Sequence, residues 1–571
     1  MCGIVVATGL DAKHLVETMC SRLSHRGPDA QGVWRSDALT MGHRRLSIID
    51  LSDAGSQPML SSDGRYVIVF NGEVYNYKEL RAELHGYPFH SNSDTEVVIA
   101  AWAKWGEASL DRLVGMFAFA LWDTQEKALV VVRDRFGVKP LVYATLPDGN
   151  LVLASEIKAL HAAGIRAEPD QTAWATYLAY GTSDHPSRTF WSGISALPAG
   201  SLLRWSPGAT PTIRRWYDLS AHVGGELDQR DRNVVAEEYL ELLRDSVRLR
   251  FRADVPVGIN LSGGLDSSIL FGLVQAVRGS DSDIKAFSFI TNDERYDELP
   301  WVRLMLEGSQ HPLVPCLLRA SDVPQLAKKI SEAVDEPFGG IPTLAYATLF
   351  QRAREEGVIV LLDGQGLDEQ WGGYDYYRPS STPAAIVQGG GDPAVRPECL
   401  VPDLVTLATK DSFSTPFNSR LRDLQYRDLT ATKIPRALRY NDRVSMAAST
   451  ELREPFLDHR LIELALRQPD DRKIADGVGK VLLRQLAKNI VPETLRTAPK
   501  RPVQTPQREW LRGELASWAN DLIETAIQTG WFNPAAKQAW QEYRSGRGDN
   551  SHWVWQWLSV GMLVSSQRKF E

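Results

Sequence analysis

Leu261-Ser262-Gly263-Gly264-Leu265-Asp266-Ser267-Ser268 is the stretch that decides the fold of the second half of this 571-residue chain. It stands between a buried apolar run, Val255–Leu261, and an apolar helical pattern, Ile269–Val277. A buried strand followed by a Gly/Ser loop and a helix is the βα unit of a parallel sheet. Two more apolar runs, Lys285–Ile290 and Val358–Leu362, alternate with helical patterns. We therefore expect a doubly wound parallel sheet, followed after about residue 400 by a helical C-terminal part.

The same loop predicts a site for phosphate groups. Gly263 and Gly264 allow a tight turn that aims backbone N–H groups at an anion, and the following helix N-terminus adds partial positive charge. The carboxylate of Asp266 would repel phosphates unless it holds Mg²⁺, which prefers oxygen ligands beside phosphates. The Walker pattern GxxxxGK[ST] does not occur in the sequence, and this disfavours a P-loop kinase or GTPase.

A second glycine-rich turn, Asp363-Gly364-Gln365-Gly366-Leu367-Asp368-Glu369, follows another predicted strand. The carboxyl ends of parallel strands share one edge of the sheet, so we expect Asp266 and Asp368 to face a common metal and nucleotide site. The alternative is that Asp368 and Glu369 are helix-start charges favoured by the helix dipole. The Pro-, Ser- and Gly-rich segment 378–398 follows this turn; a surface insertion is the simpler interpretation, and a lid is the alternative.

The N-terminal half shows a different sequence pattern. Residues 1 to about 205 are β-rich, with apolar runs at 2–6, 66–70, 117–122, 128–132 and 151–154 and helical patterns near 76–84 and 93–105. This pattern predicts sheets covered by helices. We expect one domain over 1–205, a linker over 206–231 and a second domain over 232–571.

Cys2 would become the N-terminal residue if Met1 were removed. Its thiol and α-amine have ordinary pKa values of about 8.5 and about 7.7–8.0, so the amine could serve as general base for its own side chain, as in N-terminal nucleophile enzymes. The alternative is a small residue at a chain end. Asn71 and Gly72 could supply two oxyanion donors, although Asn-Gly is also a β-turn signal.

Two further residues could bind the amino-acid end of a substrate. Arg45 could clamp a carboxylate with two hydrogen bonds, and Asp94 could accept from an ammonium group. The alternatives are a surface salt bridge for Arg45 and a helix N-cap for Asp94.

The composition narrows the class of partner. A formal net charge of −7, without a basic block, predicts neither nucleic acid nor an anionic membrane surface as a partner. No apolar run approaches the ~18 residues of a membrane span, and the N-terminus lacks signal-peptide features. We expect a cytoplasmic protein with small-molecule substrates. The four cysteines form no CxxC pair and the histidines no HxH or HExxH spacing, which argues against a disulfide framework and structural zinc.

Taken together, the motifs resemble the glutamine-dependent asparagine synthetase family over nearly the whole chain. The N-terminal part resembles a class II glutamine amidotransferase domain and the C-terminal part an ATP-pyrophosphatase-type synthetase domain. The motifs that carry the resemblance are Met1–Ile4, His25–Asp29, the Arg45 segment, Asn71–Asn76, Ser93-Asp94, Gly115–Ala120, Arg133–Gly137, Ser262–Ser268, Gly364–Tyr374, Tyr440–Met446 and Arg453–Asp458.

The resemblance implies an αββα N-terminal-nucleophile hydrolase sandwich whose Cys2 attacks the side-chain amide of glutamine. Asn71 and Gly72 would then hold the oxyanion, with Arg45, Asn71, Glu73 and Asp94 binding glutamine. Ammonia would pass through an internal channel to the second site, where ATP adenylates the acceptor carboxylate and pyrophosphate and AMP are released. The family also suggests a homodimer.

At the second site the resemblance implies ATP and Mg²⁺ as cofactors. Asp266 and Asp368 would hold the metal, and Lys500 would steady the charge that develops near the acyl phosphate; a basic surface turn is the alternative for Lys500. The ATP- and pyrophosphate-binding residues would be Leu261, Ser262, Gly263, Gly264, Asp266, Ser267, Ser268, Asp363 and Gly364.

The chain departs from aspartate-specific members at the expected acceptor site, Gln365 and Asp368. Gln365 stands where those members have a glutamate and Leu367 where they have a hydroxyl residue, and their Thr-Ile-Arg segment is not evident in Pro337–Thr343. The acceptor is therefore aspartate or another carboxylate, such as a sugar acid or a specialised metabolite. An intramolecular cyclase is disfavoured because such relatives typically lack a working N-terminal cysteine. An inactive regulatory homologue would be expected to lose both sets of motifs.

Overall fold

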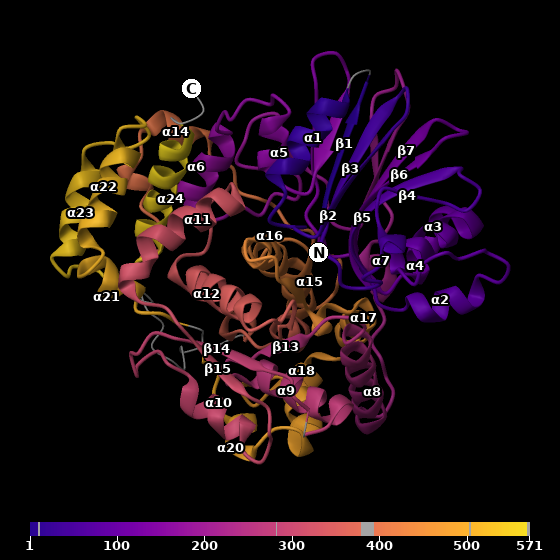
Figure 1. Cartoon of the computed structure of the whole chain (residues 1–571). Helices are drawn as coiled ribbons and strands as arrows, with labels where there is room; N and C mark the ends of the chain where they lie inside the picture. Colours follow the sequence, from indigo (N-terminus) through magenta and orange to yellow (C-terminus); the bar gives the residue numbers. More distant parts are fainter. Residues whose placement is uncertain (10–11, 281, 379–392, 502–503, 568–571) are drawn as a thin grey trace.

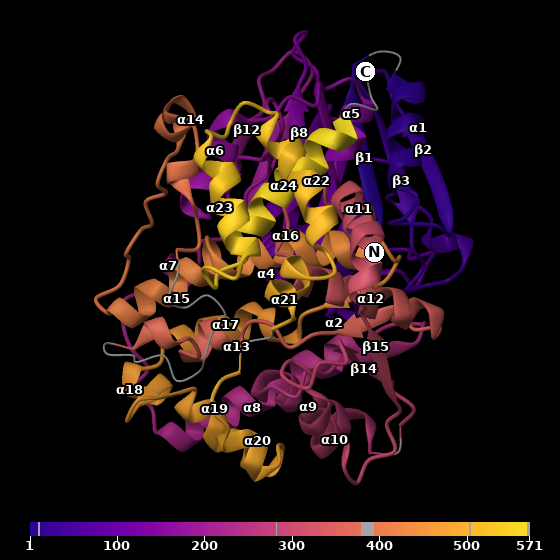
Figure 2. The same ribbon diagram turned by 90° about the vertical axis from the view of Figure 1, so that its left-hand side faces the viewer.

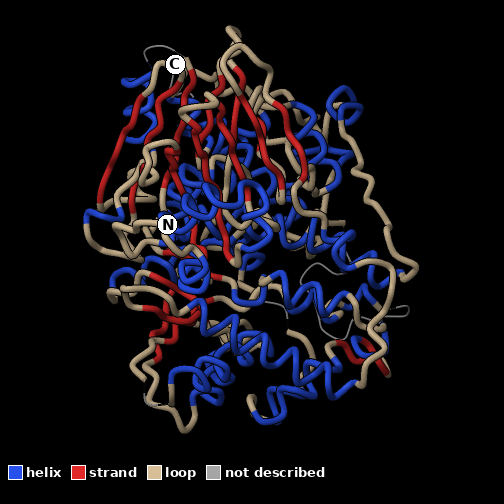
Figure 3. Tube along the Cα trace, turned by 90° about the vertical axis from the view of Figure 1, so that its right-hand side faces the viewer, coloured by secondary structure: helices blue, strands red, loops and turns tan. Residues whose placement is uncertain are grey.

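The computed structural model describes residues 1–9, 12–280, 282–378, 393–501 and 504–567. Its N-terminal part contains two six-stranded antiparallel sheets, and its C-terminal part a five-stranded parallel sheet among many helices (Figure 1). Figure 3 shows the strands gathered in the upper half of the molecule and mostly helices in the lower half. No helix in the described part of the chain is long and apolar enough to cross a membrane.

The N-terminal sheets run in the orders β10-β8-β9-β1-β3-β2 and β12-β11-β7-β6-β5-β4. The strands of the first are β1 (Gly3–Thr8), β2 (Ala30–Arg35), β3 (Leu39–Arg45), β8 (Val142–Thr145), β9 (Leu151–Ala154) and β10 (Ser195–Ala196). Those of the second are β4 (Met59–Leu60), β5 (Tyr66–Val74), β6 (Gly115–Asp123), β7 (Ala128–Arg133), β11 (Ser201–Trp205) and β12 (Thr212–Arg215).

Alternate residues of each strand divide between two apolar layers, as the pleat of a strand requires. Ile4 and Val6 of β1 share a buried cluster with Val67 and Val69 of β5, so the two sheets pack face to face. Val5 of β1 points to the other side, where helices α1 (Ala12–Arg22) and α5 (Ile157–Ala162) cover the first sheet. Helix α3 (Asp94–Trp105) covers the second sheet. The predicted αββα sandwich is confirmed.

The C-terminal sheet has the order β15-β14-β13-β16-β17, and every pair in it is parallel. Its strands are β13 (Val257–Asn260), β14 (Ala286–Ile290), β15 (Leu313–Leu317), β16 (Val360–Leu362) and β17 (Glu451–Arg453). Helices α8 (Arg232–Arg250) and α9 (Leu265–Arg278) cover one face, and α12 (Ile341–Glu355) lies against the other. The predicted doubly wound parallel sheet is confirmed.

Helices dominate the rest of the chain, as predicted for the C-terminal part. The remaining α-helices are α2 (Tyr77–Glu83), α4 (Ser109–Arg112), α6 (Gln171–Tyr180), α7 (Leu219–Val223), α10 (Leu299–Leu306), α11 (Val323–Val334), α13 (Leu367–Trp371), α14 (Pro402–Leu407), α15 (Arg420–Thr430), α16 (Lys433–Met446), α17 (His459–Leu466), α18 (Asp470–Lys473), α19 (Val481–Leu486), α20 (Glu493–Thr497), α21 (Gln507–Arg512), α22 (Ala516–Ile527), α23 (Ala535–Arg544) and α24 (His552–Gln567). A short hairpin pairs β18 (Ile474–Ala475) with β19 (Val478–Gly479).

The two halves of the chain share apolar packing. In Figure 2 the yellow C-terminal helices lie against α6 of the N-terminal half, and Trp174 of α6 belongs to the same buried cluster as Trp553 and Trp557 of α24. Strand β12 and helix α7 lie within 206–231, the stretch that the sequence assigns to a linker. Most of the segment considered as a lid or insertion, 379–392, lies outside the described residues.

Candidate active sites

Cys2 directly precedes β1, an inner strand of the first antiparallel sheet, and lies beside β5 of the second. Its backbone N–H donates to Asn71 Oδ1 at 3.0 Å, and its carbonyl accepts from Arg26 Nε at 2.9 Å. Asn71 is fully buried, and among the described residues its Nδ2 has no hydrogen-bond partner. Sequence positions 69 residues apart are thus brought together, and the side-chain NH₂ group of Asn71 stays uncommitted.

Asn71, Gly72 and Glu73 lie inside strand β5, so the β-turn interpretation of Asn71-Gly72 is wrong. Gly72 pairs with Phe117 of β6, and a Cβ at residue 72 would lie 2.1 Å from the carbonyl oxygen of Met116. Only glycine fits this close approach of two strands.

The N-terminus is buried against residues of the second half of the chain. The amine of Met1 lies 3.3 Å from Glu451 Oε2, and neither side chain is exposed. Arg453 joins Glu451 at 2.6 Å to Glu73 at 3.3 Å. Burial, followed by the nearby Glu451, raises the pKa of Glu73, and Arg453 opposes this shift. The predicted glutamine-binding residue Glu73 therefore sits in a buried charge cluster that both halves of the chain supply.

Arg45 and Asp94 are both buried, and this rules out the surface salt bridge considered for Arg45. Arg45 Nη1 donates to the carbonyl of Ser52 at 2.8 Å and its Nη2 to the carbonyl of Asp50. Asp94 is the first residue of α3, whose N-cap is Ser93; its Oδ2 accepts from the N–H of Val74 at 2.9 Å. Burial raises the pKa of Asp94 to about 6.

The thiol of Cys2 is not activated as the structure stands. Burial raises the pKa of Cys2, although the nearby N-terminal amine lowers it in part. With Met1 in place the nitrogen of Cys2 is an amide that donates to Asn71, so it has no lone pair with which to accept the thiol proton.

Arg26 is a residue to which the sequence assigned no role of its own. It is fully buried, and besides the carbonyl of Cys2 it contacts Glu156 at 2.7 Å and Asp442 at 2.8 Å. Both carboxylates lie more than 100 residues away in the chain. The signal in the sequence was the His25–Asp29 motif, but nothing local shows that this arginine connects the two halves.

The two glycine-rich turns follow β13 and β16, which are neighbours in the parallel sheet. Asn260, at the end of β13, donates to Asp363 Oδ1 at 2.9 Å, and Ser262 Oγ lies 3.1 Å from Ser267 Oγ. A Cβ at Gly364 would be 3.2 Å from the nitrogen of Ser267. The predicted phosphate loop and the second turn therefore lie against each other.

Asp266 and Asp368 face one point, where the structure places Lys480. Lys480 Nζ lies 2.5 Å from Asp266 Oδ1 and 2.7 Å from Asp368 Oδ1, and Lys500 Nζ lies 2.6 Å from Asp368 Oδ2. Burial by itself would raise the pKa of Asp368, but the two lysines hold it below its usual value. Burial raises the pKa of Asp266, partly opposed by Lys480.

Lys480 was missed by the sequence reasoning. It precedes α19 in the left-handed backbone conformation, with φ of 61°, and its N–H donates to the carbonyl of Trp371 at 2.9 Å. This tie to the end of α13 brings a residue 112 positions beyond Asp368 back to it. A single lysine after a Gly-Val-Gly turn is no distinctive signal without the fold.

A cavity of about 700 Å³ opens at this edge of the sheet, within the ~300–1,000 Å³ range of ligand pockets. Its walls are the Ser262–Ser268 loop, the second turn with Gln365 and Asp368, the two lysines, and one face of α16. Gln365 Oε1 is buried and has no hydrogen-bond partner among the described residues. Leu367 is fully buried in the apolar core, so it cannot contact an acceptor.

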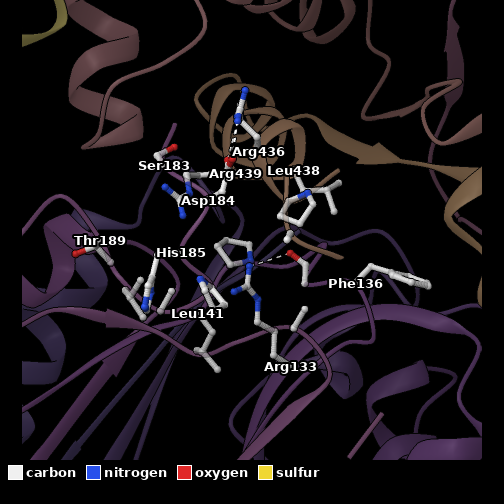
Figure 4. A pocket seen from close by; sticks show the side chains of 18 of the residues that line it. Arg133, Phe136, Leu141, Ser183, Asp184, His185, Thr189, Arg436, Leu438 and Arg439 are labelled. Atoms are coloured by element: carbon white, nitrogen blue, oxygen red, sulfur yellow. Dashed lines mark hydrogen bonds and ion pairs between the residues drawn. The ribbon is translucent and has the colours of Figure 1, made fainter. Parts of the chain in front are cut away.

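A second, smaller cavity of about 80 Å³ lies between the halves of the chain. Figure 4 shows Arg133 and His185 on one side of it and Arg436 and Arg439 of α16 on the other. Arg436 also borders the larger cavity and pairs with Asp184 at 2.7 Å.

Comparison with known protein families finds a match for each half of the chain. Residues 1–217 match the glutamine amidotransferase domain family, and residues 238–566, more than half of the chain, match the asparagine synthase family. The chain belongs to the asparagine synthase family. The resemblance inferred from the motifs is confirmed.

Relatives match over nearly their whole length. Asparagine synthetase [glutamine-hydrolyzing] 1 of Bacillus subtilis is 29% identical over 97% of this chain and 95% of its own. A putative asparagine synthetase [glutamine-hydrolyzing] of Mycobacterium tuberculosis is 31% identical over 96% and 93%. Amidase chry2 of Gibberella zeae is 29% identical over 90% and 89%.

The carboxylates of this family member suit a magnesium ion. Asp266 and Asp368 converge on one cation, Lys480, beside a loop of backbone N–H groups and serine hydroxyls. Mg²⁺ is ordinarily held by one or two carboxylates together with substrate phosphates, and this pair beside the predicted phosphate loop fits that pattern.

Proposed function

We propose that this protein is a glutamine-hydrolysing, ATP-dependent ligase that converts a carboxylic acid into its amide. The observation that carries the proposal is the presence in one chain of two built sites. In the first, the N–H of Cys2 donates to Asn71 within the N-terminal sandwich. In the second, Lys480 joins Asp266 to Asp368 in the wall of the 700 Å³ cavity.

At the first site, the Cys2 thiolate would attack the carboxamide carbon of glutamine. Removal of Met1 would convert the amide nitrogen of Cys2 into an amine able to take the thiol proton. Asn71 Nδ2, which has no partner among the described residues, and the N–H of Gly72 would donate to the oxyanion. Ammonia leaves, and water later releases glutamate from the thioester.

Arg45, Glu73 and Asp94 are proposed to hold the amino-acid end of glutamine. Within the described part of the chain, Arg45 donates one N–H of Nη1 and one of Nη2 to backbone carbonyls, so three of its five N–H groups remain for a carboxylate. Asp94 and Glu73 are acceptors of the right type for the ammonium group.

At the second site, the Ser262–Ser268 loop is proposed to hold the phosphates of ATP while the acceptor carboxylate attacks the α-phosphorus and pyrophosphate leaves. Lys480 and Lys500 would stabilise the negative charge that moves onto the leaving oxygens. Asp266 and Asp368 would hold Mg²⁺, which neutralises phosphate charge when bound. Ammonia from the first site then attacks the acyl-adenylate, giving the amide and AMP.

We propose the acceptor only as a class: aspartate, as the names of the asparagine synthetase relatives suggest, or another carboxylic acid. The amidase-named relative supports keeping the second candidate. A homodimer and the division into 1–205, 206–231 and 232–571 are likewise proposals, which sedimentation and limited proteolysis test.

The deciding experiment mixes the purified protein with glutamine, ATP, Mg²⁺ and a panel of carboxylic acids, following AMP, pyrophosphate and new amides by mass. AMP, pyrophosphate and one amide in equal amounts are expected. Glutamine hydrolysis without AMP for any acid would reduce the protein to a glutaminase. ADP and phosphate in place of AMP and pyrophosphate would overturn the adenylation step.

A further inference from the structure

One face of helix α16 forms a wall of the 700 Å³ cavity. Lys433, Arg436, Ala437 and Tyr440 all line it, and their spacing of three, four and seven residues places them on a single face of the helix. This wall is separate from the phosphate loop and from Lys480 and Lys500, which follow other elements of the fold.

Of the two cations on this face, Arg436 is already neutralised. Its Nη2 lies 2.7 and 2.9 Å from the two carboxylate oxygens of Asp184. Figure 4 draws this pair with a dashed line. Lys433, in contrast, has no hydrogen-bond or ion-pair partner among the described residues. Its half-buried ammonium lies 5.2 Å from the ring centre of Tyr374 and 5.6 Å from that of Tyr376.

The carboxylates nearest to Lys433 are engaged elsewhere. Glu369 accepts from the hydroxyl of Tyr374 at 2.7 Å. Asp428 accepts from Tyr377 at 2.7 Å and from Thr432 at 2.6 Å. Burial, followed by the neighbouring Arg436, lowers the pKa of Lys433. A partly buried cation that faces two aromatic rings but no free carboxylate lacks a counter-charge, so an anion in the cavity would gain from binding there.

Tyr374 connects Lys433 to the reacting centre. The ammonium of Lys500 lies 3.8 Å from the centre of the Tyr374 ring and contacts Asp368 at 2.6 Å. Lys433 therefore lies near the same ring as a lysine that belongs to the proposed phosphate site. A small acid whose reacting carboxylate points toward Lys500 could extend its other end along Tyr374 toward Lys433.

We propose that Lys433 binds a second anionic group of the acceptor, so that the protein amidates a dicarboxylic acid or another acid that carries an additional negative charge. This inference rests on the proposed ligase function and assigns its acceptor class. The same ammonium could instead meet a phosphate of ATP, and the experiment below separates these two sources of anion.

The test measures pyrophosphate release with ammonium chloride as nitrogen donor, which removes any dependence on Cys2. Matched pairs of acids are compared: aspartate with β-alanine, and succinate and glutarate with propionate and butyrate. For the wild type, kcat/KM is expected to be at least tenfold higher for at least one diacid than for the matched acid that lacks the second carboxylate. Loss of a charge-assisted hydrogen bond commonly weakens binding about 10- to 100-fold.

Lys433→Met is therefore expected to raise KM for the diacid about 10- to 100-fold, with kcat, KM for ATP and the monoacid reaction within about twofold. Lys433→Arg should restore part of the affinity. Arg439→Gln is the matched control, because it removes a cation of the same helix that faces the smaller cavity, and it should leave KM for the diacid unchanged. Thermal unfolding checks that each variant folds.

Three results would overturn the inference: a wild type that uses monoacids as well as diacids, a Lys433→Met variant that affects both alike, or a rise in KM for ATP instead of the acid. Absence of pyrophosphate release with every acid, while glutamine is still hydrolysed, would contradict the proposed ligase function itself.

Discussion

At the scale of single residues, the proposed role of Cys2 as a nucleophile depends on the residue that precedes it. Its N–H contacts Asn71, and its partly buried thiol has a raised pKa. The missing part is a free amine, which Met1 withholds. Because the role proposed for Cys2 concerns glutamine alone, the glutamine-dependent and ammonium-dependent reactions should separate when Cys2 is replaced.

We predict that Cys2→Ala loses glutamine-dependent amide formation by at least about 10³-fold, the scale on which a covalent nucleophile acts, but keeps the ammonium-dependent reaction within about twofold. Amide formation by mass spectrometry measures both. Intact-mass analysis of the wild type should show Met1 absent; full glutaminase activity with Met1 retained would contradict the role of the α-amine.

Lys480 is the clearest example of a residue whose place in the candidate site could be found only from the fold. Its partners Asp266 and Asp368 lie 214 and 112 positions away in the sequence, and it reaches them only because the turn after β19 is tied to the end of α13. Arg26 is similar, since its carboxylate partners come from distant segments. A local sequence pattern identifies residues that directly follow a strand. It cannot identify a lysine or arginine that a distant segment brings to the same place.

We predict that Lys480→Met lowers kcat for amide formation about 10²- to 10³-fold, because the charge that develops on the leaving phosphate loses a preorganised cation. Glutamine hydrolysis should stay within about twofold. Lys488→Met removes an exposed lysine two residues past the end of α19 and serves as the control. Equal effects of the two variants would show that Lys480 acts only through bulk charge.

At the scale of elements, the strands and helices that carry the sites could be predicted because their patterns are local. Alternation or short apolar runs located β1, β5, β6, β7 and β9, and a glycine-rich turn located the edge of the parallel sheet. The interpretation that failed also came from a local pattern. Asn71-Gly72 has the composition of a turn, yet it lies inside β5, because pairing with β6 decides its conformation. Leu367 similarly packs into the core, although its place in the motif suggested the acceptor site.

Gly72 therefore provides a test of the β5–β6 pairing. A methyl group at residue 72 would meet the carbonyl oxygen of Met116, so the strands would have to separate and the Gly72 N–H would move. We predict that Gly72→Ala destabilises the protein by about 1–3 kcal/mol and lowers glutaminase activity at least tenfold, whereas ammonium-dependent synthesis remains. Gly225→Ala, where nothing lies within 4 Å of the added Cβ, is the control. Unchanged glutaminase in Gly72→Ala would contradict the proposed oxyanion donor.

At the scale of the whole molecule, buried charge joins the two halves of the chain. Arg26 pairs with Glu156 of its own half and with Asp442 of α16, and Lys139 lies 3.4 Å from the other oxygen of Asp442. Met1 and Arg453 make a second junction through Glu451. Arg26 also donates to the carbonyl of Cys2, and Met1 directly precedes Cys2, so the junction between the two halves adjoins the proposed glutaminase site.

Removing one member of such a network should cost more than any surface ion pair. Arg26→Met leaves Glu156 and Asp442 buried with less compensation, and breaking a buried pair in this way commonly costs about 3–5 kcal/mol. We predict a loss of that size in the free energy of unfolding, measured in urea by fluorescence. Because the loss comes from stranded carboxylates, Arg26→Met combined with Asp442→Asn should recover part of it. A double variant whose loss equals the sum of the two single losses would show that Arg26 and Asp442 do not interact, and the junction would then depend on apolar packing alone.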